Sequence, residues 1–205
     1  MRFTTSAADG GSWTELLASR TDFDGHPPLD RLRLFWPLAS GSPDRDAVAL
    51  SLIFSPWVAG RSEHPAPFSA LTEQRIVEWF QSQRIWASAG PVRIGGLPLP
   101  RGTRRLLLSG SPSSEREVLL RLVPSTEGGM VQEQEVHVAT NAGTLIAHAP
   151  DATSAFSMRL GVAVLLAESL SITEIVDPEF AASAPEQFRA AARLVECVAL
   201  GLRSA

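Results

Sequence analysis

Apolar and polar residues alternate with a period of two in two early segments of the chain, at 31–38 and 47–58. Such a period places the apolar side chains on one face of a strand. The stretch Gly41-Ser-Pro-Asp44 between the two segments has the residues of a turn. We therefore expect the two segments to pair as an antiparallel hairpin.

Three or four further strands are expected in the middle of the chain, at 104–109, 116–123, 131–139 and 144–149. Asn141-Ala-Gly143 separates the last two segments and fits a three-residue hairpin loop, in which the glycine takes the left-handed conformation. Because consecutive strands joined by short turns usually pair, this half of the chain predicts an antiparallel meander.

Two helices are predicted in the first half of the chain. Ser12 and Glu15 form a capping box, which predicts a short helix over 13–20. Ser69 can cap a second helix, whose apolar stripe ends near Gln83.

The C-terminal third predicts two more helices and one short strand. Residues 152–170 contain LGVAVLLA, an apolar stretch typical of a helix that is buried on most sides. A second capping box, Ser183 to Glu186, predicts the start of the last helix. Residues 173–176 could form an edge strand, and an unpaired edge there could pair two copies of the chain as a homodimer.

These segments predict the α+β class, with a mainly antiparallel sheet of about six or seven strands and helices packed on one face. A chain of 205 residues can bury enough surface for one core without disulfides or metals. Residues 1–11 are polar and small, and we expect a flexible N-terminal arm there. Residues 12–205 are then expected to form a single domain.

Composition narrows the choice of partner. All 18 basic residues are arginine and tyrosine is absent, which we interpret as the codon bias of a GC-rich bacterial genome. The net charge of −4 argues against general binding to nucleic acid or to anionic membranes, because both need a surplus of positive charge. An acidic protein would suit a basic protein partner.

Two features predict a cytoplasmic protein. The first eleven residues lack the apolar core of a signal peptide, and the longest apolar run, 160–167, is far shorter than a membrane helix. The one cysteine, Cys197, lies in an apolar helical pattern, which predicts a buried, inert thiol in a reducing compartment.

The strongest candidate for a metal or acid–base site is Glu133-x-Glu135-x-His137, because a strand would place these three side chains on one face. Two carboxylates and an imidazole can act as metal ligands or acid–base groups, with Arg121 expected nearby as a charge partner. The same pattern also fits a solvated polar face, which is the interpretation we favour. His148 is expected on the opposite, core-facing side.

Three arginines lie close together in the sequence, at Arg101, Arg104 and Arg105. Such a cluster could bind a carboxylate or phosphate group in a bidentate fashion. A solvated turn that leads into a strand explains these arginines equally well.

Asp22-Phe23-Asp24-Gly25 resembles the opening motif of the haloacid-dehalogenase-like phosphatases. In that family the first aspartate is a nucleophile at the end of a buried strand. Because the residues before Asp22 predict an amphipathic helix, we interpret the two aspartates as turn-forming residues.

The five tryptophans differ in their surroundings. Trp79 lies on the apolar face of a predicted helix and is expected in the core. Trp57 and Trp86 flank proline-containing loops, where they could form a partner surface or anchor the loops to the body of the protein.

The chain has no nucleophile elbow and no phosphate-binding glycine loop, and no cofactor is predicted. We therefore predict a non-enzymatic protein that binds a partner protein, of the immunity-protein type or the secretion accessory or chaperone type. The alternative is a hydrolase or a small-ligand or metal-binding protein that uses the face of Glu133, Glu135 and His137.

Overall fold

The structure, a computed structural model, describes the chain apart from residues 8–12, 39–41, 94–101, 128 and 205. The strands in this part are β1 (Arg2–Ala7), β2 (Thr14–Ser19), β3 (Arg31–Phe35), β4 (Gly60–Ser69), β5 (Ala87–Arg93), β6 (Arg104–Leu107), β7 (Glu117–Pro124), β8 (Met130–Gln132), β9 (Glu135–Thr140), β10 (Ile172–Val176) and β11 (Gly201–Arg203). They form one sheet in the order β11-β10-β6-β7-β9-β3-β2-β1-β4-β5, and β8 pairs with β9 beside this path.

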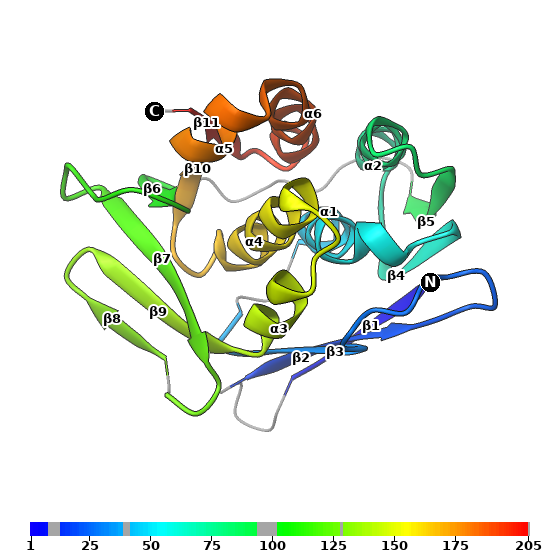
Figure 1. Cartoon of the computed structure of the whole chain (residues 1–205), viewed down its shortest axis with the longest axis horizontal. Coiled ribbons are helices and arrows are strands. Elements are labelled where there is room, and N and C mark those ends of the chain that lie inside the picture. Colours follow the sequence, from blue (N-terminus) through cyan, green and yellow to red (C-terminus); the bar gives the residue numbers. More distant parts are fainter. Residues whose placement is uncertain (8–12, 39–41, 94–101, 128, 205) are drawn as a thin grey trace.

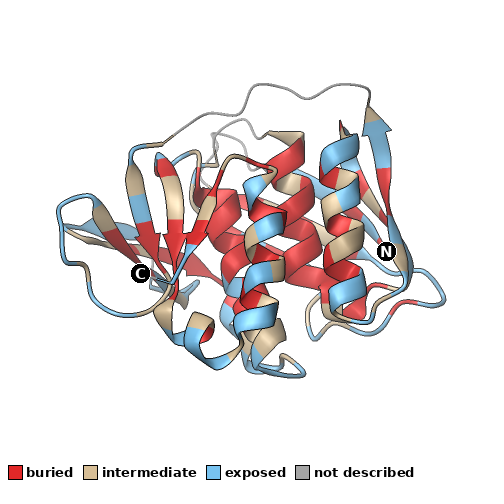
Figure 2. Cartoon of the chain, turned by 90° about the horizontal axis from the view of Figure 1, so that it is seen from above, coloured by how far each residue is buried: buried red, intermediate tan, exposed pale blue. Residues whose placement is uncertain are grey.

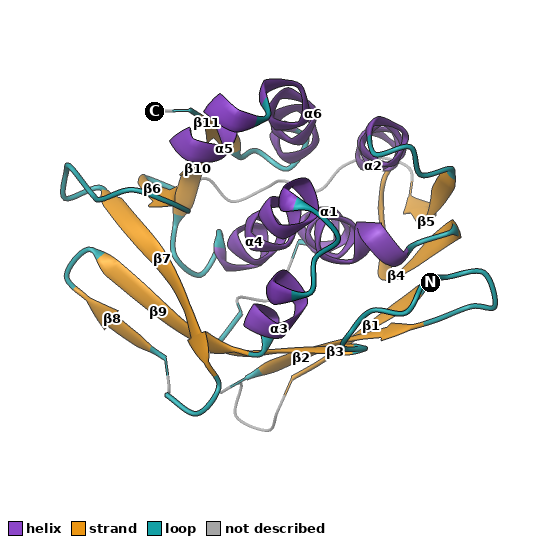
Figure 3. Ribbon diagram, in the orientation of Figure 1, coloured by secondary structure: helices purple, strands orange, loops and turns teal. Residues whose placement is uncertain are grey.

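The helices lie on the concave side of the curled sheet, as Figures 1 and 3 show. They are α1 (Pro43–Phe54), η1 (Ser55–Trp57, a 3-10 turn), α2 (Ala70–Ser82), α3 (Ala142–Ala147), α4 (Ala152–Leu166), α5 (Pro178–Ser183) and α6 (Pro185–Glu196). Helices α1 and α4 occupy the centre of the fold, and most of their residues are buried (Figure 2). None of the helices in the described residues is both long and apolar enough to cross a membrane.

The expected mainly antiparallel sheet of six or seven strands is wrong. The eleven strands of the described residues form six parallel and four antiparallel pairs, so the protein belongs to the α/β class. Strands β11 to β9 are parallel to one another, as are β1, β4 and β5, and antiparallel pairs join the two groups. The prediction failed because it paired neighbours along the chain, whereas β3 pairs with the distant β9 and β6 with β10.

The expected strand at 47–58 is also wrong, because this segment forms most of helix α1. The helix is buried on nearly every side, so its apolar positions do not show the period of a surface helix. A local signal for the helix was present. Pro43 lies at its start and Asp44 and Asp46 lie in its first turn, where both residue types are favoured.

The N-terminal segment is a strand pair in place of the expected arm and helix. Strand β1 pairs with β2 from Arg2 opposite Ser19 to Ala7 opposite Thr14. Met1 and Phe3 are buried, which ties the start of the chain to the core. Residues 8–11 of the expected arm and Ser12 of the capping box lie outside the described residues.

The expected hairpin at Asn141-Ala-Gly143 is replaced by the start of helix α3. The Asn141 side chain continues the pairing of β9 with β3, because its Oδ1 accepts from the Arg33 N–H at 2.8 Å and its Nδ2 donates to the Arg31 carbonyl at 2.8 Å. The Thr140 hydroxyl donates to the Arg33 carbonyl at 2.7 Å and accepts from the Ala142 N–H at 3.0 Å. Side-chain hydrogen bonds therefore end the strand here and begin the helix.

Two expectations in the C-terminal third need correction. Strand β10 lies between β11 and β6, so it is not the free edge that was expected to pair two copies of the chain. Ser183 ends α5, and α6 begins after Ala184, so the predicted capping box does not form.

Several local predictions are confirmed. Strands β3, β6, β7, β9 and β10 overlap the segments in which strands were expected, and α4 lies within 152–170. Helix α2 begins at Ser69, whose hydroxyl accepts from the Thr72 N–H, and Trp79 of this helix is in the core. The Cys197 thiol is partly buried, and burial raises its pKa to about 11, as expected for an inert thiol.

Asp44 joins α1 to the start of α2 and to the end of β5. Its Oδ1 accepts from the Ser69 N–H at 2.8 Å and from the Thr72 hydroxyl at 2.7 Å, and its Oδ2 forms an ion pair with Arg93. Burial by itself raises the pKa of Asp44, but these donors outweigh burial and hold the pKa below its ordinary value.

Candidate functional site

A hollow of about 570 Å³ lies at the end of the sheet where β1 and β4 begin. Arg2 of β1 is paired with Ser19 at the end of β2 and with Glu63 of β4, which brings the three strands together here. The hollow is lined by Met1, Arg2, Ser19, Arg20, Thr21, Phe23, Ala59, Gly60, Arg61 and Glu63. We call it the β1/β4 hollow.

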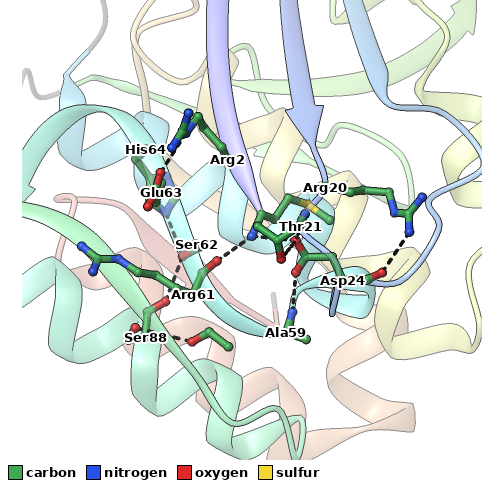
Figure 4. Close-up of polar contacts among 12 residues, drawn as sticks. Arg2, Arg20, Thr21, Asp24, Ala59, Arg61, Ser62, Glu63, His64 and Ser88 are labelled. Atoms are coloured by element: carbon green, nitrogen blue, oxygen red, sulfur yellow. Dashed lines mark hydrogen bonds and ion pairs between the residues drawn. The ribbon is translucent and has the colours of Figure 1, made fainter.

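Asp24 lies buried beside the β1/β4 hollow and holds together the chain segments that form it (Figure 4). Its Oδ2 forms an ion pair with the Met1 amine at 2.8 Å and accepts from the Thr21 N–H and hydroxyl at 2.7 and 2.8 Å. Its Oδ1 accepts from the Ala59 N–H at 2.8 Å. Burial raises the pKa of Asp24, but these four donors outweigh it and lower the pKa overall.

This arrangement explains the Asp22-Phe23-Asp24-Gly25 motif. The motif does follow a strand, β2, where a helix was expected. Asp22 is exposed, however, while both oxygens of Asp24 are taken up by hydrogen bonds within the fold. Asp24 therefore organises a turn, as we interpreted it from the sequence.

Three arginines line the β1/β4 hollow, and they differ in their partners. Arg2 Nε donates to Glu63 Oε2 at 2.8 Å, and this hydrogen bond lowers the pKa of Glu63. Arg20 reaches only the Asp24 carbonyl, at 3.4 Å. Neither Arg20 nor Arg61 forms an ion pair with a carboxylate among the described residues, although Arg61 is attracted electrostatically to Glu63. The lining of the hollow therefore carries more positive than negative charge.

Two exposed aromatic residues belong to the same end of the sheet. Phe23 lines the β1/β4 hollow and is 85% exposed. Trp86 is 83% exposed and directly precedes Ala87, the residue of β5 that pairs with Gly60 of the hollow. Phe23 was not singled out from the sequence, although a large apolar residue between two aspartates in a loop is an unusual position.

The structure separates the two tryptophans that were expected near a partner surface. Trp86 is exposed, whereas Trp57 is only 8% exposed and its ring contacts Phe54 with 6.4 Å between centroids. The Trp57 carbonyl accepts from the Gly25 N–H at 2.8 Å. Trp57 therefore anchors the loop that carries Phe23, and its own ring is not available on the surface.

His64 lies on the core side of β4, behind the β1/β4 hollow. Its ring packs between Phe3 and Phe68, at 5.1 Å from each ring centroid, and its Nε2 is 3.2 Å from the Ser62 hydroxyl. Burial lowers the pKa of His64 to about 3, and the positive Met1 amine adds to this effect. The imidazole is therefore neutral in the folded protein at neutral pH.

We expect the His64→Phe variant to lose less stability on acidification than the wild-type protein. Because folding lowers the pKa of His64 from 6.5 to about 3, its stabilising contribution is complete above pH 6.5 and declines as the pH falls towards 3. Between pH 7 and pH 5 the decline amounts to about 2 kcal/mol. Urea unfolding of both proteins at these two pH values measures the difference.

The exposed His26 supplies the control, because the His26→Asn variant should show the wild-type pH dependence. An equal loss of stability in the His64→Phe variant and the wild-type protein would show that His64 is not a buried neutral group.

The stretch that carries Glu133, Glu135 and His137 is divided between a turn and a strand. Glu135 and His137 lie on one face of β9, with 3.0 Å between Oε2 and Nε2, and this hydrogen bond lowers the pKa of Glu135. Arg121 of β7 lies beside them, 3.5 Å from Glu135 Oε1, as expected from the sequence. Glu133 lies in the turn before β9 with a φ of 40° and is exposed.

Neither histidine of this region provides a metal site. Within the described ranges, no group of three or more histidine, cysteine or carboxylate side chains could hold a metal ion. His148 was expected in the core, but it is exposed at the end of α3, where its Nδ1 is 2.9 Å from the Thr144 carbonyl.

Within the described residues, the structure does not bring the arginine cluster expected at Arg101, Arg104 and Arg105 together as one site. Arg101 lies outside the described residues. Arg104 and Arg105 are neighbours in β6, so their side chains point to opposite faces of the sheet. Arg105 lies between two carboxylates, with its Nε 2.8 Å from Glu174 Oε2 and its Nη1 3.6 Å from Glu117 Oε1.

The β1/β4 hollow thus combines an excess of positive charge with the exposed ring of Phe23, and the exposed Trp86 lies beside it. The residues that form it come from three strands and the loops beside them, and Trp86 beside it is the only residue of this region that was proposed from the sequence as a binding residue. Comparison of the chain with models of known families, with curated proteins and with solved structures finds no match, so its function has to be inferred from this geometry alone.

Proposed function

We propose that this chain is a non-enzymatic bacterial cytoplasmic protein that binds a partner protein at the β1/β4 hollow. The observation that carries the proposal is the exposure of Phe23 and Trp86, at 85% and 83%, at one end of the sheet. Aromatic side chains are enriched at the centres of protein interfaces, where burying them contributes much of the binding free energy. The partner would be a toxin if the chain is an immunity protein, or a secreted protein if it is a secretion accessory or chaperone.

The polar groups of the β1/β4 hollow favour binding over catalysis. Asp24 already accepts four hydrogen bonds or ion pairs, and Glu63 is bound to Arg2. A general base or a nucleophile needs a side chain that is free to take a proton or to attack. Neither carboxylate meets this requirement.

The alternative of a hydrolase or ligand-binding face needs Glu133, Glu135 and His137 together. Glu133 lies in the turn, so only one carboxylate and one imidazole share the face of β9. That pair is bound to itself and to Arg121, which suits a solvated polar surface. We therefore do not propose it as a second function.

Photo-crosslinking tests where the partner binds. With benzoylphenylalanine in place of Phe23 or of Trp86, we expect irradiation in an extract of the source organism to link both variants to the same protein. Arg116, an exposed residue in the loop before β7, gives a matched control position that should not capture that protein. Recovery of the same proteins from all three positions would contradict the proposed site.

Truncation of the two aromatic residues is expected to weaken binding to the captured partner. The Phe23→Ala/Trp86→Ala protein should bind at least about tenfold more weakly, because exposed aromatic anchors are often worth more than 1 kcal/mol at an interface. Isothermal titration calorimetry measures the change. Val131→Ala removes another exposed apolar side chain, on β8, and should leave the affinity unchanged.

A further inference from the structure

We propose that the segment bound at the β1/β4 hollow is an extended acidic stretch of the partner protein, which spans the hollow from Arg20 to Arg61. This inference rests on the proposed function and specifies the chemistry of the partner. It starts from the two arginines of the hollow that form no ion pair with a carboxylate among the described residues, in a chain whose net charge is −4. A local surplus of positive charge on an acidic protein directs an acidic segment to this one end.

The direction of the side chains distinguishes an extended segment from a small anion. Figure 4 shows that Arg20 and Arg61 extend to opposite sides, with Thr21 and Asp24 between them. Arg61 lies across β5, since a Cβ atom at Gly90 would be 2.9 Å from Arg61 Nη2. Guanidinium groups that extend away from each other favour a peptide with acidic residues several positions apart over a single phosphate or carboxylate.

The other charges at this site do not change its sign. The positive Met1 amine and the negative Asp24 form a buried ion pair that cancels. Arg2 and Glu63 form a second pair, with a separation of 2.8 Å between Nε and Oε2. The exposed Asp22 lies in the turn between Thr21 and Phe23 and offsets only one of the two charges of Arg20 and Arg61. The overall acidity of the chain favours a basic partner, but the charge at this site is positive.

The aromatic residues add one requirement to the bound segment. Phe23 lines the β1/β4 hollow together with the two arginines, and its ring is exposed. A bound segment that covers this ring would gain most by placing an apolar side chain against it. The bound segment therefore combines acidic residues, which face the arginines, with an apolar residue, which covers Phe23.

The test uses a displayed library of random peptides of about 12 residues, long enough to cross the site in extended form. Selection against the full chain should enrich peptides that carry several aspartate or glutamate residues together with an apolar residue. Synthetic copies of these peptides should bind at least about tenfold more weakly to the Arg20→Glu/Arg61→Glu variant. Their affinity should also fall as the salt concentration rises from about 0.05 to about 0.5 M.

The Arg116→Glu/Arg159→Glu variant is the matched control, because it makes the same change of charge at two exposed arginines elsewhere in the fold. This variant should bind the peptides as the wild-type protein does. An equal loss in both variants would show a general effect of net charge and would overturn the proposal, as would selection of basic or uncharged peptides.

The outcomes also separate this inference from the proposed function. If the selected peptides are not acidic but lose binding in the Phe23→Ala/Trp86→Ala protein, the β1/β4 hollow is a protein-binding site and only the acidic segment is refuted. If neither pair of substitutions weakens binding of the peptides, both proposals fail.

Discussion

Substitution of Gly161 by valine is expected to lower the free energy of unfolding by about 3 kcal/mol, at the upper end of the usual cost of overpacking a core. Gly161 lies in α4 where this helix crosses α1. A Cβ atom there would be 2.6 Å from Ile53 Cγ1 and 2.8 Å from the Ala49 carbonyl oxygen. Because one of these neighbours is backbone in a buried helix, α1 and α4 would have to move apart.

Gly143 provides the matched control, since it is also a helical glycine but a Cβ atom there would meet nothing within 4 Å. Gly143→Ala should therefore stabilise the protein by up to about 1 kcal/mol, through the higher helix propensity of alanine. Chemical denaturation of both variants compares the two effects. If Gly161→Val is as stable as the wild-type protein, α1 and α4 are not in the close contact described.

The Asp24→Asn variant is expected to lose about 4 kcal/mol at pH 7, because it leaves a buried positive charge without its counter-charge. The Met1 amine loses its counter-charge, and the amide group of asparagine would face at least one of the donors from Thr21 and Ala59. The closely similar shape of asparagine ensures that packing is not the cause. Thermal and urea unfolding both measure the loss.

The pH dependence of this variant follows from the sign of the pKa change. Folding holds the pKa of Asp24 below 3.8, so its stabilising effect is present above that pH and is lost as the pH falls through the folded pKa. The difference between the wild-type protein and the variant should therefore shrink in strong acid. Asp22→Asn, at an exposed position in the same turn, is the control and should cost little at any pH.

Local patterns identified elements wherever a segment carries its own signal. Helix α2 has a cap at Ser69 and an apolar stripe with Trp79, and both are local features of the chain. Strand β3 alternates between buried Leu32 and Leu34 and exposed arginines, which is the period of a sheet with one buried face. These elements were predicted because their surroundings resemble those of ordinary amphipathic segments.

The same reasoning failed where a segment is decided by its distant neighbours. Residues 14–19 (TELLAS) are mostly good helix formers, but β2 is held as a strand by β1 on one side and β3 on the other. In α1 the reverse occurs, because a helix surrounded by the sheet, α2 and α4 has no polar face to reveal its period. Tertiary contacts overrode the local preference in both segments.

The candidate site likewise combines features that the local sequence indicates with features that only tertiary contacts decide. The proline-containing loops predicted that either Trp57 or Trp86 could lie on a partner surface. Only the folded structure shows that Trp57 packs against Phe54 whereas Trp86 is exposed. Arg20 and Arg61 are 41 positions apart in the sequence, and nothing in either local stretch connects them. They line one hollow because Arg2 of β1 pairs with both Ser19 and Glu63.

The sequence by itself determined the helices and strands that carry a local period or cap, the acidic net charge, and the scarcity of catalytic motifs. Tertiary structure alone decided the parallel pairing, the burial of α1 and the assembly of the β1/β4 hollow. The physical reason is that a period or a cap depends on residues a few positions apart. The pairing of strands and the exposure of a side chain depend on residues that only the folded chain brings together.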